Sequence, residues 1–157
     1  MIDAALAALE ASPIAESLRA SRYAYPLVNA AHILALAALF GSILALDLRL
    51  LGAWREVPIV PLARVLPRVS AGGLLFALVT GLALFSVQPF EYLAHPVFPV
   101  KLGLIAFGAV NALLLHRALA WRSLDDAARV PPRLKFAAGL SLVAWTGAIV
   151  AGRWLAF

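Results

Sequence analysis

Three side chains that could take part in chemistry lie inside long apolar segments of the sequence. His32 falls in a largely apolar stretch that runs from residue 29 to residue 52. Lys101 and Arg153 lie in two other apolar stretches, each close to one end. Polar or ionisable groups inside membrane-spanning segments are energetically costly, so each of them is a functional hypothesis by default. Their depths in the membrane decide whether they can act together.

These groups are expected to share one layer near the same face of the membrane. With a rise of about 1.5 Å per residue, His32 lies roughly 9 Å below the start of its segment and Lys101 roughly 4–5 Å below the start of its own. Arg153 comes four residues before the end of the last segment. Asn29 lies one helical turn from His32, on nearly the same helix face.

An imidazole beside buried cations fits one cofactor in particular. Neutral imidazole is a common axial ligand of haem iron, and a cationic side chain can pair with a carboxylate such as a haem propionate. The pattern predicts a b-type haem near the outer face, with His32 as axial ligand and Asn29 beside it. Lys101 is either the second ligand or a propionate partner, and Arg153 is a propionate partner. In the alternative, the two cations only extend to the interface and His32 only bonds a carbonyl.

A second group of polar residues is expected at the opposite membrane face. His116 follows the start of its segment by eighteen residues, which places it roughly 27 Å deeper, too far to share an iron with His32. Asp47, Arg49 and Arg117 belong to that same end. We expect a structural ion pair or an ion network among these four residues.

The composition excludes several kinds of site. The chain has no cysteine and Met1 is its only methionine, which excludes disulfides, thiolate metal sites and sulfur ligation of Cu(I). Three histidines at scattered depths do not provide a catalytic zinc site, and no phosphate-binding glycine loop is present. The net charge of +5 comes from basic residues between apolar segments, so no nucleic-acid partner is expected.

The elements that must position these residues are membrane-spanning helices. Hydrophobic residues make up 64% of the chain, well above the 45–50% of soluble domains. A spanning helix needs about 20 apolar residues. Four segments meet this requirement, at about residues 26–50, 69–87, 98–121 and 134–157.

The first residues differ in character from these spans. They open with Asp3 rather than with the positive charge of a signal peptide. Ser12 and Pro13 form a helix-start signal inside residues 2–22, which are predicted to form one or two amphipathic helices on the membrane surface. The predicted fold is therefore all-α, a single domain spanning 1–157 that forms an integral-membrane four-helix bundle with an N-terminal amphipathic surface helix.

Basic residues predict the orientation of this bundle. Nine of the thirteen lysines and arginines fall in the first and third connections: Arg49, Arg55, Arg64, Arg68, Arg117, Arg122, Arg129, Arg133 and Lys135. Loops rich in Lys and Arg stay on the cytoplasmic side. We therefore expect a multi-pass protein of the bacterial inner membrane with both termini on the periplasmic side.

Two segments carry a resemblance to a known group. "AHILALAALFGSILALDLRLLG" and "FPVKLGLIAFGAVNALLLH" resemble the first and third helices of HemJ-type proteins, small bacterial haem-binding membrane proteins linked to protoporphyrinogen oxidation. Their early histidine and lysine match His32 and Lys101, and Arg49 and Thr80-Gly81 also match. Their wider superfamily includes CopD-like copper-resistance domains. Over nearly its whole length the chain is also similar to a family of uncharacterised small bacterial four-helix membrane proteins.

The expected function follows from these residues and from the resemblance. The chain is expected to be a small inner-membrane b-type haem protein in electron transfer or porphyrin handling. If it is an enzyme, the resemblance implies a membrane oxidoreductase like HemJ-type protoporphyrinogen oxidase. Its expected partners are the lipid bilayer, a membrane or periplasmic redox partner, and further copies of itself or a larger complex. The alternatives are a haem-free structural or accessory subunit and, third, a CopD-like copper-related protein.

Overall fold

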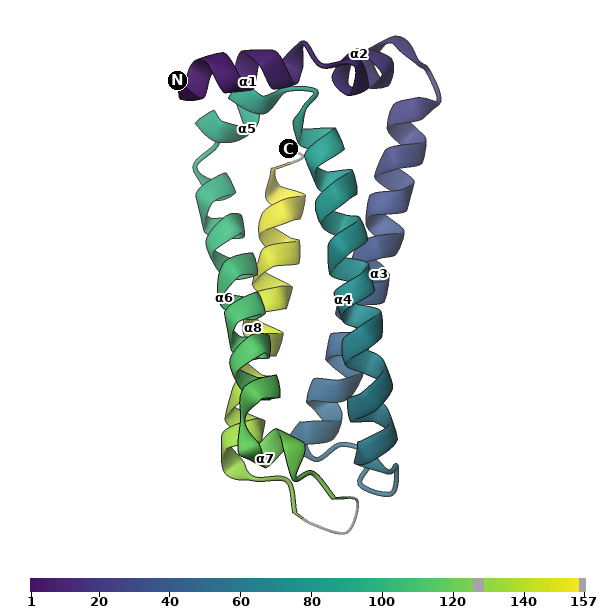
Figure 1. Ribbon diagram of the computed structural model, residues 1–157, viewed down its shortest axis with the longest axis vertical. Helices are drawn as coiled ribbons and strands as arrows, with labels where there is room; N and C mark the ends of the chain where they lie inside the picture. The colour runs from purple at the N-terminus through teal and green to yellow at the C-terminus, as the bar shows by residue number, and fades with distance from the viewer. Residues whose placement is uncertain (126–128, 156–157) are drawn as a thin grey trace.

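A computed structural model describes residues 1–125 and 129–155, and the regular elements among them are all helices. Four of these helices are long and apolar enough to cross a membrane (Figure 1). They are α3 (Ala24–Leu51), α4 (Ile59–Phe85), α6 (Val97–Arg117) and α8 (Pro132–Trp154). The predicted all-α fold with four spanning helices is confirmed. The last two residues of the predicted fourth span lie outside the described residues.

The spanning helices form two antiparallel pairs that meet through their inner members. α3 packs against α4, α6 packs against α8, and α3 also packs against α8 (Figure 1). Most of the buried residues of the spanning helices belong to α3 and α8, whereas α4 and α6 bury few. The exposed leucines, valines and phenylalanines of α4 and α6 suit contact with lipid, which is as apolar as they are.

A close approach between helices joins α3 and α4. A Cβ atom added at Gly73 would lie 2.6 Å from the backbone N of Leu39 and 2.9 Å from the carbonyl O of Ala35. Ala35 and Leu39 are both buried in this contact. Small residues let helix backbones come this close in a membrane, where close van der Waals packing drives association.

Two connecting regions differ from the prediction. α4 begins ten residues before the predicted start at residue 69 and runs through Pro67. These extra turns are stabilised by Ile59, which is buried against Leu50 and Leu134 in the apolar core at this end of the bundle. The predicted third span stops at Arg117, after which the chain forms the short helix α7 (Leu119–Arg122).

The other end of the bundle is covered by short helices. α1 (Ile2–Glu10) and α2 (Pro13–Ala20) lie across the ends of the spanning helices (Figure 1). α1 contacts α5 (Pro89–Ala94), a short helix that was not predicted from the sequence. The predicted start of α2 is confirmed, because Ser12 Oγ accepts the Ala15 N–H at 3.3 Å. The starts of α3 and α6 and the end of α8 all lie at this end (Figure 1).

Candidate functional site

The ring of His32 is held by a hydrogen bond from α3 to α4. Its Nδ1 lies 2.9 Å from Oγ1 of Thr80. That hydroxyl donates its single proton to the carbonyl of Phe76 at 2.6 Å, so Thr80 Oγ1 acts as the acceptor toward the ring. The proton of the neutral imidazole is therefore on Nδ1. Nε2 retains the lone pair with which histidine binds metals.

Glycines on α4 let the ring approach that helix. A Cβ atom at Gly81 would lie only 3.1 Å from Cε1 of His32. Thr80 and Gly81 thus work as a pair, since one accepts the hydrogen bond and the other leaves room for the ring. The close approach at Gly73, two helical turns earlier on α4, sets the separation of α3 and α4 that this hydrogen bond requires.

Lys101 lies near this histidine. It is partly buried in the first turns of α6, and its ammonium is near enough to His32 to act on the imidazole electrostatically. Its stem passes α8 at Gly152, where an added Cβ would lie 3.4 Å from Cε and 3.5 Å from Nζ. The position of Lys101 therefore requires a glycine at Gly152 of α8, just as the position of the His32 ring requires one at Gly81 of α4.

The other two predicted site residues lie at the surface. Asn29 precedes His32 by one turn of α3 and is exposed. Arg153 is exposed in the last turn of α8, directly after the glycine that Lys101 passes. The structure thus brings the histidine and the lysine together, while Asn29 and Arg153 lie at the rim of the same end.

The donor atoms of this end suit some metal groups better than others. Among residues 1–125 and 129–155, no three His, Cys, Asp or Glu side chains gather as they would around a metal ion. A zinc or copper ion held by protein side chains alone lacks a donor set in this part of the chain. Haem iron needs only one or two axial ligands from the protein. One oriented imidazole with a cation beside it fits that requirement.

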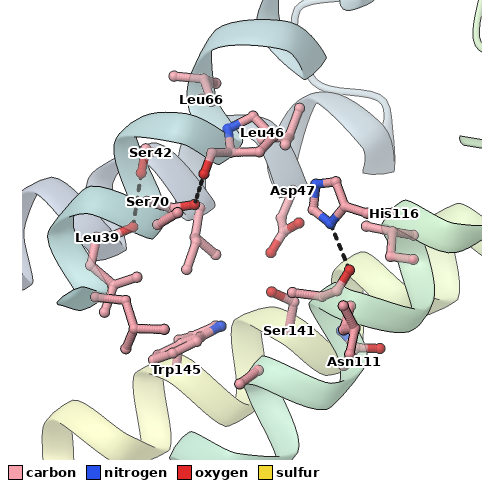
Figure 2. A pocket seen from close by; sticks show the side chains of 18 residues that line it. Leu39, Ser42, Leu46, Asp47, Leu66, Ser70, Asn111, His116, Ser141 and Trp145 are labelled. Carbon is pink, nitrogen blue, oxygen red and sulfur yellow. Dashed lines mark hydrogen bonds between the residues drawn. The ribbon is translucent and has the colours of Figure 1, made fainter. Parts of the chain in front are cut away.

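A cavity of about 360 Å³ lies deeper in the bundle, toward the end opposite α1 and α2. Figure 2 shows it from close by. α3, α4, α6 and α8 all line it, and half of the lining residues are leucine or alanine. Three of the residues that line it each carry a buried polar atom without a hydrogen-bond partner, namely Oδ2 of Asp47, Nε2 of His116 and Nε1 of Trp145. Sequence reasoning placed Asp47 and His116 at this end but missed Trp145. The sequence feature that could have identified Trp145 is its spacing from Ser141, because residues four apart lie on one face of a helix.

The ion network expected at this end is not formed. Arg49 is buried, and it donates from Nε to the carbonyl of Val57 at 2.7 Å and from Nη2 to that of Arg55 at 3.2 Å. Asp47 interacts with the Ser141 side chain instead. The reason is geometric, because the short connection after α3 turns its carbonyl oxygens back toward Arg49. Arg49 therefore stabilises that connection and leaves Asp47 facing the cavity.

The remaining members of the expected network also have other surroundings. His116 Nδ1 lies 2.6 Å from the carbonyl of Ala112, and its ring meets the edge of Trp121 with centroids 4.6 Å apart. Arg117 is exposed. The aspartate and the histidine therefore share a cavity rather than a salt bridge (Figure 2).

Two arrangements of polar side chains thus lie at different depths of the bundle. The first includes His32 and Lys101 near the end covered by α1 and α2, and the second surrounds the cavity. Comparison of the chain with protein-family models, with curated proteins and with solved structures finds no match, so its function has to be inferred from these side chains.

Proposed function

We propose that this membrane protein binds one b-type haem through His32 and serves electron transfer or porphyrin handling. The observation that carries the proposal is the hydrogen bond between His32 and Thr80. Metal-ligating histidines usually donate their other ring N–H to a nearby acceptor, which fixes the tautomer and the orientation of the ring. Here Nδ1–H has such an acceptor and Nε2 keeps its lone pair.

The roles of the other residues follow from charge and position. Lys101 holds a propionate by a charge-assisted hydrogen bond, or binds the iron as a neutral amine. Arg153 and Asn29, at the exposed rim, contact the polar edge of the group. When bound, haem supplies a one-electron redox centre, and the protein's part is to fix the axial imidazole and to place positive charge beside it.

The proposal includes a location. Four apolar spanning helices make this a membrane protein, and we infer the bacterial inner membrane with both termini on the periplasmic side. The excess of arginine in the first and third connections supports that orientation. The haem would then lie near the periplasmic face, where a periplasmic or membrane redox partner can approach it.

One absorbance spectrum of the purified protein tests the haem. The wild type is expected to show a Soret band, and His32→Ala is expected to lose it while circular dichroism stays helical. His116→Ala is the matched control, because it removes an imidazole at the opposite end and should keep the band. A normal band in both variants would reject His32 as the ligand. A wild type that takes up no added haem would favour the haem-free accessory subunit.

A further inference from the structure

The cavity among the four spanning helices has the size and lining of a ligand site. Its volume of about 360 Å³ falls within the 300–1,000 Å³ typical of small-molecule pockets. Such pockets combine apolar walls with a few well-placed polar groups. Here the leucines come from three helices and the polar atoms from α3, α6 and α8 (Figure 2).

The three unpartnered atoms define what a ligand must offer. His116 Nδ1 donates to the carbonyl of Ala112, so its unpartnered Nε2 is an acceptor. Oδ2 of Asp47 is an acceptor as well, and Nε1–H of Trp145 is a donor. Asp47 and Trp145 are each only 4% exposed, so bulk water does not satisfy them. The ligand must bring hydroxyl donors to one side and an oxygen acceptor to the other.

Other polar side chains of the cavity have partners within the protein. Asn111 donates from Nδ2 to the carbonyl of Ala137 at 2.9 Å. Ser42 donates to the carbonyls of Ala38 and Leu39, and Ser70 donates to that of Pro67. Ser141 lies beside Asp47 and interacts with its carboxyl group. These hydroxyls are used within the protein, so the hydrogen bonds still available concentrate on Asp47, His116 and Trp145. Figure 2 shows the carboxylate of Asp47 between the ring of His116 and Ser141.

The apolar walls of the cavity determine the polarity and shape of the ligand. Leu39, Leu46, Leu66, Leu74 and Leu113 line the cavity, which lies between helices that cross the membrane. A ligand that reaches this site comes from the bilayer, so it is uncharged and largely apolar. The indole of Trp145 adds a flat aromatic surface, against which a ring packs better than an alkyl chain. Water alone would satisfy the polar atoms but would wet the leucine walls.

We propose that this cavity binds a lipid-soluble hydroxylated aromatic ring of the hydroquinone class. One ring hydroxyl donates to Asp47 or His116, and the oxygen at the other side of the ring accepts the N–H of Trp145. This site is separate from the haem proposal and does not depend on it, since neither His32 nor Lys101 is among the residues that line the cavity. A redox role for the bound ring would require the haem, but binding does not.

Calorimetric titration of the haem-free protein in nanodiscs tests the site. The probe is a benzohydroquinone with a short alkyl chain, and its partition into empty nanodiscs is subtracted. Saturable binding is expected for the wild type. Trp145→Phe keeps an aromatic ring but removes the unpartnered indole N–H, so the affinity should fall about tenfold, the value of one buried hydrogen bond. Trp154→Phe, an exposed tryptophan on the same helix, should change affinity less than twofold.

Two further variants separate the possible causes of a negative result. Asp47→Leu replaces the carboxylate with an apolar group of similar shape, and it should weaken binding at least as much as Trp145→Phe. His32→Ala should bind the probe like the wild type, whatever it does to haem. The absence of saturable binding to the folded wild type, as expected of a cavity filled only by water, would overturn the proposal. Equal affinities of Trp145→Phe and Trp154→Phe would overturn it too.

Discussion

The contact between α3 and α4 at Gly73 allows a strong test of the structure. A Cβ atom there would lie 2.6 Å from the backbone N of Leu39, and backbone atoms cannot swing away as a side chain can. At the neighbouring Gly72, an added Cβ meets nothing within 4 Å. Gly73→Ala and Gly72→Ala are therefore chemically identical changes, one residue apart on one helix, with opposite expected effects.

The magnitude follows from these distances. Carbon and nitrogen atoms pack best at about 3.5–4.0 Å, so the two helices must separate by about 1 Å if Gly73 gains a Cβ atom. A gap of that size removes up to about half of the van der Waals attraction of each neighbouring contact. Overpacking of this kind costs about 1–3 kcal/mol. Gly72→Ala, with free space, stabilises by about 0.4–1 kcal/mol. The two variants should differ by roughly 1.5–4 kcal/mol in free energy of unfolding.

Gly73→Ala should also affect the hydrogen bond between His32 and Thr80. His32 precedes Leu39 by seven residues and Thr80 follows Gly73 by seven, so the hydrogen bond lies two turns from the contact on both antiparallel helices. A separation of about 1 Å lengthens that 2.9 Å bond beyond the range of hydrogen bonding. Gly73→Ala is therefore expected to retain less haem than Gly72→Ala, although neither residue contacts the ring.

Unfolding in mixed micelles measures the first effect. The detergent dodecyl sulfate is titrated into each folded variant, and circular dichroism follows the helices. A Gly73→Ala protein as stable as Gly72→Ala would refute the close helix contact and the separation that it sets for His32. Loss of stability with unchanged haem retention would refute only the link to the hydrogen bond.

Three further predictions concern charge and exposure. Lys101→Arg should keep haem with an unchanged spectrum if the lysine pairs with a propionate, because arginine keeps its charge but offers no free lone pair; a change from a low-spin to a high-spin spectrum would show that lysine had been on the iron. Since the chain has no cysteine, single cysteines can report topology: a cysteine at Glu91 should react with an impermeant label outside intact cells, and cysteines at Glu56 and Ser123 should not. The reverse pattern would invert the orientation. Burial raises the pKa of Tyr92 in α5. The resulting contribution to stability is fully present below about pH 10, the ordinary pKa of tyrosine, and it is lost as the pH rises through the raised pKa. Tyr92→Phe should remove that alkaline loss in a thermal unfolding series, and an unchanged pH profile would contradict the assignment.

Much of the fold follows from properties that need no knowledge of neighbours. Hydropathy summed over about 20 residues identifies a spanning helix, and the fixed rise of a helix converts residue number into depth. Counting alone therefore placed His32 and Lys101 at one end and His116 at the other. It placed the start of α4 ten residues too late, because Pro67 and two arginines resemble a loop, whereas the burial of Ile59 extends the helix.

The partners of each polar group were decided only by the tertiary structure. Membrane helices face lipid and protein with equally apolar side chains, so hydropathy does not reveal how each helix is rotated about its axis. That rotation determines that His32 meets Thr80, that Arg49 turns to backbone carbonyls, and that Asp47, His116 and Trp145 surround one cavity. The sequence by itself determined four spans and the depth of each polar residue. The contacts across helices came from the tertiary packing, because they depend on small residues such as Gly73 and Gly81, whose importance is visible only when a second helix lies against them.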